Sequence, residues 1–282
     1  MEDAKDEIIN YIAMLVNNNE SIGKVLSLYG EKGCGKTSLI KDGIAKVLDR
    51  PFFCIALGGC KDSSFLKGHS YTYEGALPGR IAQILIEAKC MNPIIYFDEL
   101  DKVSENTGGQ DIMSVLTHLI DPVQNMLYTD YYFDGIKIDL SKVTFIFSYN
   151  DYSKCDEIVL DRIKQIKIKT PSVDDKINIT RKNLILNIRK EYKITKDVII
   201  SDDNIRYLII KANESGCRNL RRYLEDIITR LNNMEITNNV VTKEYRSIPK
   251  EKYTNVLVVD RDVIDLILEK DSNIQNYHSM YT

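Results

Sequence analysis

The strongest chemical pattern in the chain is a glycine-rich run that fits G-x-x-x-x-G-K-[ST] at every fixed position. Its residues are Gly30, Glu31, Lys32, Gly33, Cys34, Gly35, Lys36 and Thr37. Glycines allow backbone N–H groups to curl around phosphates, and the N-terminus of a following helix adds a favourable potential. Lys36 would reach the β- and γ-phosphates, and the Thr37 hydroxyl would take a Mg²⁺ position. The run therefore predicts a site for ATP and Mg²⁺.

Two adjacent carboxylates, Asp98 and Glu99, form a second candidate for chemistry. They follow the apolar run Ile94–Phe97, which is typical of a buried strand. Open α/β sheets bind ligands at the carboxyl ends of their strands. We predict that Asp98 holds Mg²⁺ and that Glu99 orients and deprotonates the attacking water. Without the phosphate loop, the same pair could be a strand-end cap or a solvated pair of acids.

Short apolar runs that alternate with helical patterns would position these residues. The runs are Val25–Tyr29, Phe52–Leu57, Ile94–Phe97, Val143–Ser148 and Ile166–Lys169. Such runs indicate buried parallel strands joined by crossover helices, the first of them over Ser38–Leu48. We therefore predict an α/β nucleotide-binding domain over residues 1–170, with a five-stranded parallel sheet covered by helices on both faces.

Residues 171–282 differ in character and predict a small helical lid domain. Pro171 interrupts the chain, and Ser172 and Ser201 are helix-capping signals. From Arg218 onward the apolar residues trace one face of a helix. The expected helices run over 173–192, over 204–212, from 218 onward and over 261–270, and the polar stretch Thr237–Lys252 is expected to loop out.

Composition narrows the function classes. The 282 residues are 44% apolar with a formal net charge of −3, which favours a packed core and gives no bulk attraction to nucleic acid. The sequence has no apolar run long enough for a membrane helix and no secretory signal at its start. Its six cysteines include no C-x-x-C pair, and its histidines show no zinc-type spacing. We expect free thiols in a reducing, cytoplasmic compartment.

Several further segments, in order along the chain, resemble the ATPase module of the Lon proteases, within the AAA+ superfamily. The segments are Leu57–Asp62, Gly68–Arg80, Asn92–Lys102, Leu119–Asn125, Asp139–Val143, Leu160–Arg162 and Arg218–Leu220. The resemblance implies an ATP-hydrolysing domain that assembles into a ring, a hexamer by analogy. It also implies a protein substrate.

The resemblance implies roles for four more residues. Asn150 resembles the sensor-1 residue that helps to align water, and Arg162 resembles the arginine finger that reaches a neighbouring subunit's γ-phosphate. Arg218 resembles sensor 2, and Tyr73 resembles the aromatic pore-loop residue that grips a threaded polypeptide. Considered alone, the arginines could be surface or salt-bridged residues, Asn150 a turn former, and Tyr73 a residue that packs its own loop. For the adenine, we expect contacts near Tyr11 and Ile12.

The sequence also departs from this family. Its phosphate loop has Glu31 and Lys32 where the family has a proline pair, and Glu74 follows Tyr73 where an apolar residue is usual. No Ser–Lys protease motif occurs, so we expect no peptidase activity from this chain alone and allow for a separate protease or adaptor.

Three functions remain open from the sequence. The leading prediction is an ATPase that remodels or translocates a protein substrate. The alternatives are a nucleotide-gated scaffold or adaptor with little turnover, and a clamp-loader-like ATPase that acts on nucleic acid.

Overall fold

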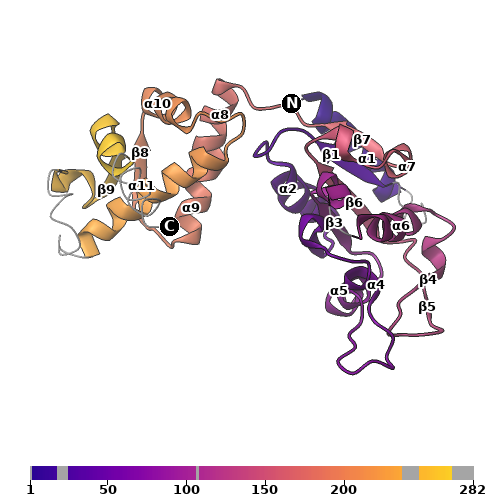
Figure 1. Ribbon diagram of the computed structural model, residues 1–282. Helices are drawn as coiled ribbons and strands as arrows, with labels where there is room; N and C mark the ends of the chain where they lie inside the picture. Colours follow the sequence, from indigo (N-terminus) through magenta and orange to yellow (C-terminus); the bar gives the residue numbers. More distant parts are fainter. Residues whose placement is uncertain (1, 18–24, 106–107, 237–247, 269–282) are drawn as a thin grey trace. The chain divides into compact units, whose positions relative to one another are not determined.

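The computed structural model describes residues 2–17, 25–105, 108–236 and 248–268. The chain divides into two compact units, residues 1–169 and residues 170–282, and each is described by itself. Figure 1 shows the first unit as a layered α/β body and the second as a group of helices. Within the described residues, no helix is long and apolar enough to cross a membrane.

The first unit is built on a parallel five-stranded sheet, as the sequence predicts. The strand order is β2-β3-β6-β1-β7. The strands are β1 (Leu26–Tyr29), β2 (Phe52–Ala56), β3 (Ile94–Asp98), β6 (Thr144–Tyr149) and β7 (Lys164–Lys167). Because β3, β6 and β1 are neighbours, the chain segments that follow them meet at one edge of the sheet.

The fifth strand differs from its expected position by two residues. Leu26 of β1 pairs with Lys164, and Tyr29 pairs with Lys167, so β7 begins before the apolar run that was expected to form it. This strand lies at the edge of the sheet, where polar side chains can point into solvent, and only Ile166 of the four residues is buried. The hydrophobic pattern alone therefore marked its position imperfectly.

Helices cover both faces of the sheet. One face packs on α1 (Glu2–Asn17) and on a continuous helix over 36–48, which consists of α2 (Lys36–Ser38), a π-helical stretch η1 (Leu39–Ala45) and α3 (Lys46–Leu48). The other face packs on α4 (Ser64–Lys67), α5 (Arg80–Ala88), α6 (Gly109–Ile120) and α7 (Glu157–Asp161). Strand β3 shows the division clearly, because Ile94 and Tyr96 face the first layer while Ile95 and Phe97 face the second.

The second unit is mostly helical, as predicted, and contains a pair of strands that was not predicted. Its elements are α8 (Val173–Ile179), π-helical η6 (Thr180–Leu184), α9 (Ile185–Glu191), α10 (Asp202–Ala212), α11 (Arg218–Ile236), the short 3-10 helix η8 (Lys250–Lys252) and a helix over 261–268. Ser172 and Ser201 cap α8 and α10 through their side chains.

The unpredicted strands are β8 (Asp197–Ile200) and β9 (Val256–Val259), which pair in parallel. Two expected features fall partly outside the described residues. These are the loop over Thr237–Lys252, of which 237–247 is not described, and the end of the last helix at 269–270.

Candidate functional site

The phosphate loop, residues 30–37, connects the end of β1 to the start of α2. Gly33 and Gly35 have φ angles of +78° and +91°, which L side chains rarely adopt. At Gly30, an added Cβ would lie 2.4 Å from the carbonyl oxygen of Ile168. The side chain of Cys34, which belongs to the loop, is buried, and this burial raises the pKa of its thiol. The glycine positions of the motif are thus required by the backbone path.

Lys36 lies with its ammonium group inside the loop. Its Nζ donates to the carbonyl oxygens of Gly30 at 2.7 Å and Glu31 at 3.1 Å, and to Oδ1 of Asn150 at 2.8 Å. The side chain is only 8% exposed. A buried ammonium group must be matched by acceptors, and here three oxygens converge on it. The arrangement shows that the loop can surround a charge and that Asn150, at the end of β6, borders the same space.

Strand β3 delivers Asp98 and Glu99 to the same edge of the sheet. Glu99 has a φ of +63°, a left-handed conformation that costs a non-glycine residue free energy and often marks a functional position. Its carboxylate lies over Gly58, where an added Cβ would be 2.6 Å from Oε2. No sequence motif marks Gly58 as a site residue, yet the position of the Glu99 carboxylate depends on the absence of a side chain at Gly58.

A cluster of hydroxyl groups joins the phosphate loop to Asp98. Thr37 Oγ1 lies 3.2 Å from the hydroxyl of Tyr96, which lies 2.7 Å from Ser148 Oγ and 3.0 Å from Asp98 Oδ1. Ser148 Oγ also donates to Asp98 Oδ1, as does the backbone N–H of Glu99 at 3.1 Å. No sequence motif identifies Tyr96 and Ser148 as site residues. The available signal was a tyrosine inside a buried apolar strand, where its hydroxyl needs a partner.

The buried side chain of Asp101 connects the chain segments that follow strands β3 and β6. Its side chain is 2% exposed, and Oδ2 accepts the backbone N–H of Asp151 at 3.3 Å. This contact ties the turn after β3 to the residue that follows Asn150. The chain segments that carry Glu99 and Asn150 are therefore held together directly.

The described residues suit a magnesium ion shared with a nucleotide. They contain no group of three or more histidine, cysteine or acidic side chains that could hold a metal ion alone. Mg²⁺ is commonly bound through one or two carboxylates together with substrate phosphates and water. The three hydrogen bonds that the described residues make to Asp98 all end on Oδ1, which fits an Oδ2 that is turned toward a ligand.

Within the described residues of the first unit, Arg162 makes no hydrogen bond or ion pair with this cluster. Arg162, at the end of α7, forms an ion pair with Asp121 at 3.0 Å, and the two side chains are 41% and 21% exposed. Arg218 begins α11 in the second unit and is exposed. Tyr11 is buried in the core between α1 and the sheet, and Ile12 packs partly against that core.

Tyr73 lies on an exposed loop between α4 and α5, which Figure 1 shows extending away from the sheet. Its side chain is 69% exposed, so it does not pack its own loop. The base of the loop is fixed, because the buried carboxylate of Asp130 accepts the N–H of Gly79 at 2.9 Å and the His69 N–H donates to Leu77 at 3.2 Å. Burial raises the pKa of Asp130. A rigid base thus carries an exposed aromatic tip.

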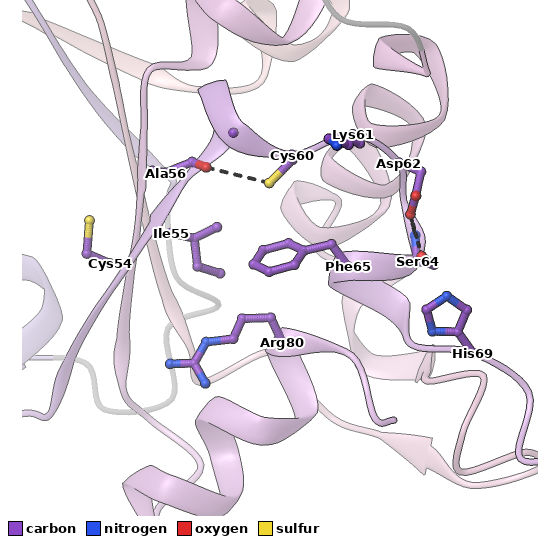
Figure 2. A pocket seen from close by; sticks show the side chains of 11 residues that line it. Cys54, Ile55, Ala56, Cys60, Lys61, Asp62, Ser64, Phe65, His69 and Arg80 are labelled. Atoms are coloured by element: carbon purple, nitrogen blue, oxygen red, sulfur yellow. Dashed lines mark hydrogen bonds between the residues drawn. The ribbon is translucent and has the colours of Figure 1, made fainter. Parts of the chain in front are cut away.

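A separate pocket of about 560 Å³ opens beside the edge strand β2. Figure 2 shows the Phe65 ring of α4 pointing toward Ile55, with Arg80 at the start of α5 and His69 at the base of the exposed loop. None of the predicted phosphate or metal residues lines this pocket. His69 and Arg80, which line the pocket, lie at the two ends of the loop that carries Tyr73, and no residue of the phosphate loop lines it.

Sequence comparisons agree with this geometry. Residues 26–172 match the family described as ATPase family associated with various cellular activities (AAA). The chain is 40% identical over 234 residues to a Lon protease homolog of Acanthamoeba polyphaga mimivirus, and 39% identical over 233 residues to the mitochondrial Lon protease homolog of Yarrowia lipolytica. A Lon protease of Campylobacter concisus is 39% identical over 253 residues.

These matches cover 82%, 82% and 86% of this chain but only 23%, 20% and 30% of the respective relatives. The chain thus spans less than a third of the length of each. The family match extends from β1 past β7 and includes the phosphate loop, Asp98, Glu99 and Asn150. The chain therefore belongs to the AAA family of ATPases and is related to the ATPase domain of the Lon proteases.

Proposed function

We propose that this chain binds ATP with Mg²⁺, hydrolyses it in a ring of identical subunits, and uses the reaction to remodel or move a protein substrate. The observation that carries the proposal is the convergence of Lys36, Thr37, Asp98, Glu99 and Asn150 at the ends of three adjacent strands. Every part of the phosphoryl-transfer template that one subunit must supply has a candidate in this group. We assign no peptide cleavage to the chain.

The phosphate-binding step follows from the contacts of Lys36. Its ammonium group exchanges the carbonyl oxygens of Gly30 and Glu31 for phosphate oxygens, while the backbone N–H groups of the loop surround the phosphates. Thr37 and Asp98 would hold Mg²⁺, which neutralises charge on the phosphate oxygens when it is bound. The glycines of the loop admit this arrangement without side-chain clashes.

Glu99 is the proposed general base, and Asn150 is proposed to align the water that attacks. Glu99 follows Asp98 directly, so its carboxylate is placed one residue beyond the metal ligand. Its left-handed backbone turns it toward Gly58. Asn150 uses Oδ1 to accept from Lys36, which leaves its amide N–H groups available for a water or phosphate oxygen.

Arg162 and Arg218 complete the proposal. Exposed ion pairs contribute on the order of 0–1 kcal/mol, so the pair between Arg162 and Asp121 can open at low cost. Exposure of Arg162 supports a role toward a neighbouring subunit, where an arginine finger raises turnover by roughly 10³–10⁵-fold. We propose that Arg218 contacts the nucleotide from the second unit.

The protein substrate is proposed from the exposed loop of Tyr73. An aromatic side chain at the tip of a loop with a fixed base can contact a polypeptide without unfolding its own domain. Glu74, which is also exposed, adds a negative charge beside it and favours substrate segments that are not purely apolar. This acidic neighbour is also the observation that keeps the scaffold function as the second candidate.

The experiment that tests the proposal measures MgATP turnover per subunit over a range of protein concentrations, with Glu99→Gln and Arg162→Ala. We expect turnover per subunit to rise with concentration, to vanish in Glu99→Gln and to fall by at least about 10³-fold in Arg162→Ala, while both variants still bind ATP. Normal turnover in Arg162→Ala would exclude a shared site. ATP binding without turnover at any concentration would favour the scaffold.

A further inference from the structure

We propose that Tyr96 is a positioning residue that aims the Thr37 hydroxyl and the Asp98 carboxylate at Mg²⁺. This inference rests on the proposed function. Tyr96 is fully buried on the interior strand β3, and its ring stacks on Phe52 with centroids 6.0 Å apart. Its hydroxyl is the only atom of the described residues that lies within hydrogen-bond distance of both proposed metal ligands.

The direction of the hydrogen bonds follows from counting protons. An ionised carboxylate only accepts, so Ser148 must donate its single proton to Asp98 Oδ1. Ser148 then has no proton left to donate to Tyr96. Tyr96 therefore donates its single hydroxyl proton to Ser148 Oγ at 2.7 Å or to Asp98 Oδ1 at 3.0 Å. Tyr96 has no second proton, so toward Thr37 it must accept.

Thr37 therefore donates its hydroxyl proton to Tyr96 over 3.2 Å. A hydroxyl ligates a metal through its lone pairs, and its proton needs an acceptor on the other side. Tyr96 supplies that acceptor and so fixes the rotation of the Thr37 hydroxyl. On Asp98, the hydrogen bonds from Tyr96, Ser148 and the Glu99 N–H all end on Oδ1. Oδ2 is therefore left to bind the metal.

Burial makes this arrangement firm. Tyr96 is 0% exposed, so water cannot take the place of its hydroxyl as the partner of Thr37, Ser148 and Asp98. Partners of this kind, one step removed from the metal, typically change metal affinity by 10–100-fold when they are removed.

The test compares Tyr96→Phe with Tyr149→Phe. Tyr149 is equally buried on the adjacent strand β6, but its hydroxyl donates to Gln165 at 2.9 Å and touches neither proposed metal ligand. Both variants keep the aromatic ring and lose one oxygen. A fluorescent ATP analogue is titrated without divalent metal and again with saturating Mg²⁺. We divide the dissociation constant measured without metal by the one measured with Mg²⁺. This ratio equals the Mg²⁺ affinity of the protein–ATP complex relative to that of free ATP.

We expect this ratio to fall about tenfold in Tyr96→Phe and to stay at the wild-type value in Tyr149→Phe, with metal-free ATP binding within about twofold in both. Mn²⁺ electron paramagnetic resonance with a non-hydrolysable ATP analogue should show the same loss of bound metal. The inference is overturned by an unchanged ratio in Tyr96→Phe, by equal weakening with and without Mg²⁺, or by the same fall in Tyr149→Phe. Absence of ATP binding by the wild-type protein would instead refute the proposed function.

Discussion

Adjacent glycines at positions 58 and 59 provide a sharp test of the role of Glu99. An added Cβ at Gly58 would lie 2.6 Å from Oε2 of Glu99 and 3.4 Å from Cβ of Lys102, whereas an added Cβ at Gly59 has no neighbour within 4 Å. Neither glycine has a left-handed backbone. Gly58→Ala and Gly59→Ala are therefore the same chemical change in the same short 3-10 helix, η2 (Leu57–Gly59), and differ in what the new methyl group meets.

The magnitude follows from the contact distance. Ordinary van der Waals contact begins near 3.4 Å, so the Glu99 carboxylate must retreat by about 0.8 Å in Gly58→Ala. This atom is the end of a flexible side chain, so we expect the free energy of unfolding to change by less than about 1 kcal/mol. A reacting group displaced by about 1 Å can lose roughly 10²-fold in rate. Turnover of Gly58→Ala should thus fall by about 10–100-fold.

The assay is steady-state MgATP turnover together with ATP affinity and urea unfolding for both variants. Gly59→Ala should match the wild-type protein in all three measurements. Gly58→Ala should match it in affinity and stability and fail in turnover. Equal turnover in the two alanine variants would refute the reasoning, because it would mean that the position of the Glu99 carboxylate over Gly58 has no bearing on hydrolysis.

Two further predictions concern the exposed loop and the second unit. Asp130→Ala removes the acceptor of the Gly79 N–H. Because an unsatisfied buried N–H costs about 1–3 kcal/mol, hydrogen exchange of the Gly79 amide should become at least about tenfold faster. Unchanged exchange in Asp130→Ala, or an equal increase in the control variant of the exposed residue Asp134, Asp134→Ala, would contradict the role of Asp130. Glu214 accepts the N–H of Leu220 in the first turn of α11 at 2.8 Å, so Glu214→Ala should lower the free energy of unfolding of the second unit by about 1 kcal/mol in urea titration. Glu214→Gln keeps an acceptor and should lose less, and equal losses in both variants would argue against this cap.

Local sequence signals predicted most elements of the first unit. Strand β3 could be located because Ile94–Phe97 is apolar on both faces, and the helix over 36–48 because it follows a phosphate loop. The apolar pattern predicts β7 two residues too late, because an edge strand carries polar residues such as Lys164 and Lys167 and loses the apolar signal. The pairing with β1, a contact between distant parts of the chain, sets its true register.

The second unit shows the same limit more strongly. Its helices could be predicted from capping serines and from the period of the apolar residues, which are local features. The strands β8 and β9 pair across more than fifty residues of intervening chain, and neither four-residue run shows in isolation that it has a partner.

Motifs and the local pattern of apolar residues are enough to predict the family, the parallel sheet and the residues that follow strands β3 and β6, because these are properties of short segments. Tertiary packing sets which groups surround those residues. It placed the hydroxyls of Tyr96 and Ser148 between Thr37 and Asp98, laid the Glu99 carboxylate over Gly58, and paired Arg162 with Asp121. Such contacts join residues that lie about forty to sixty positions apart, and their distances are set by how the strands pack rather than by any local propensity.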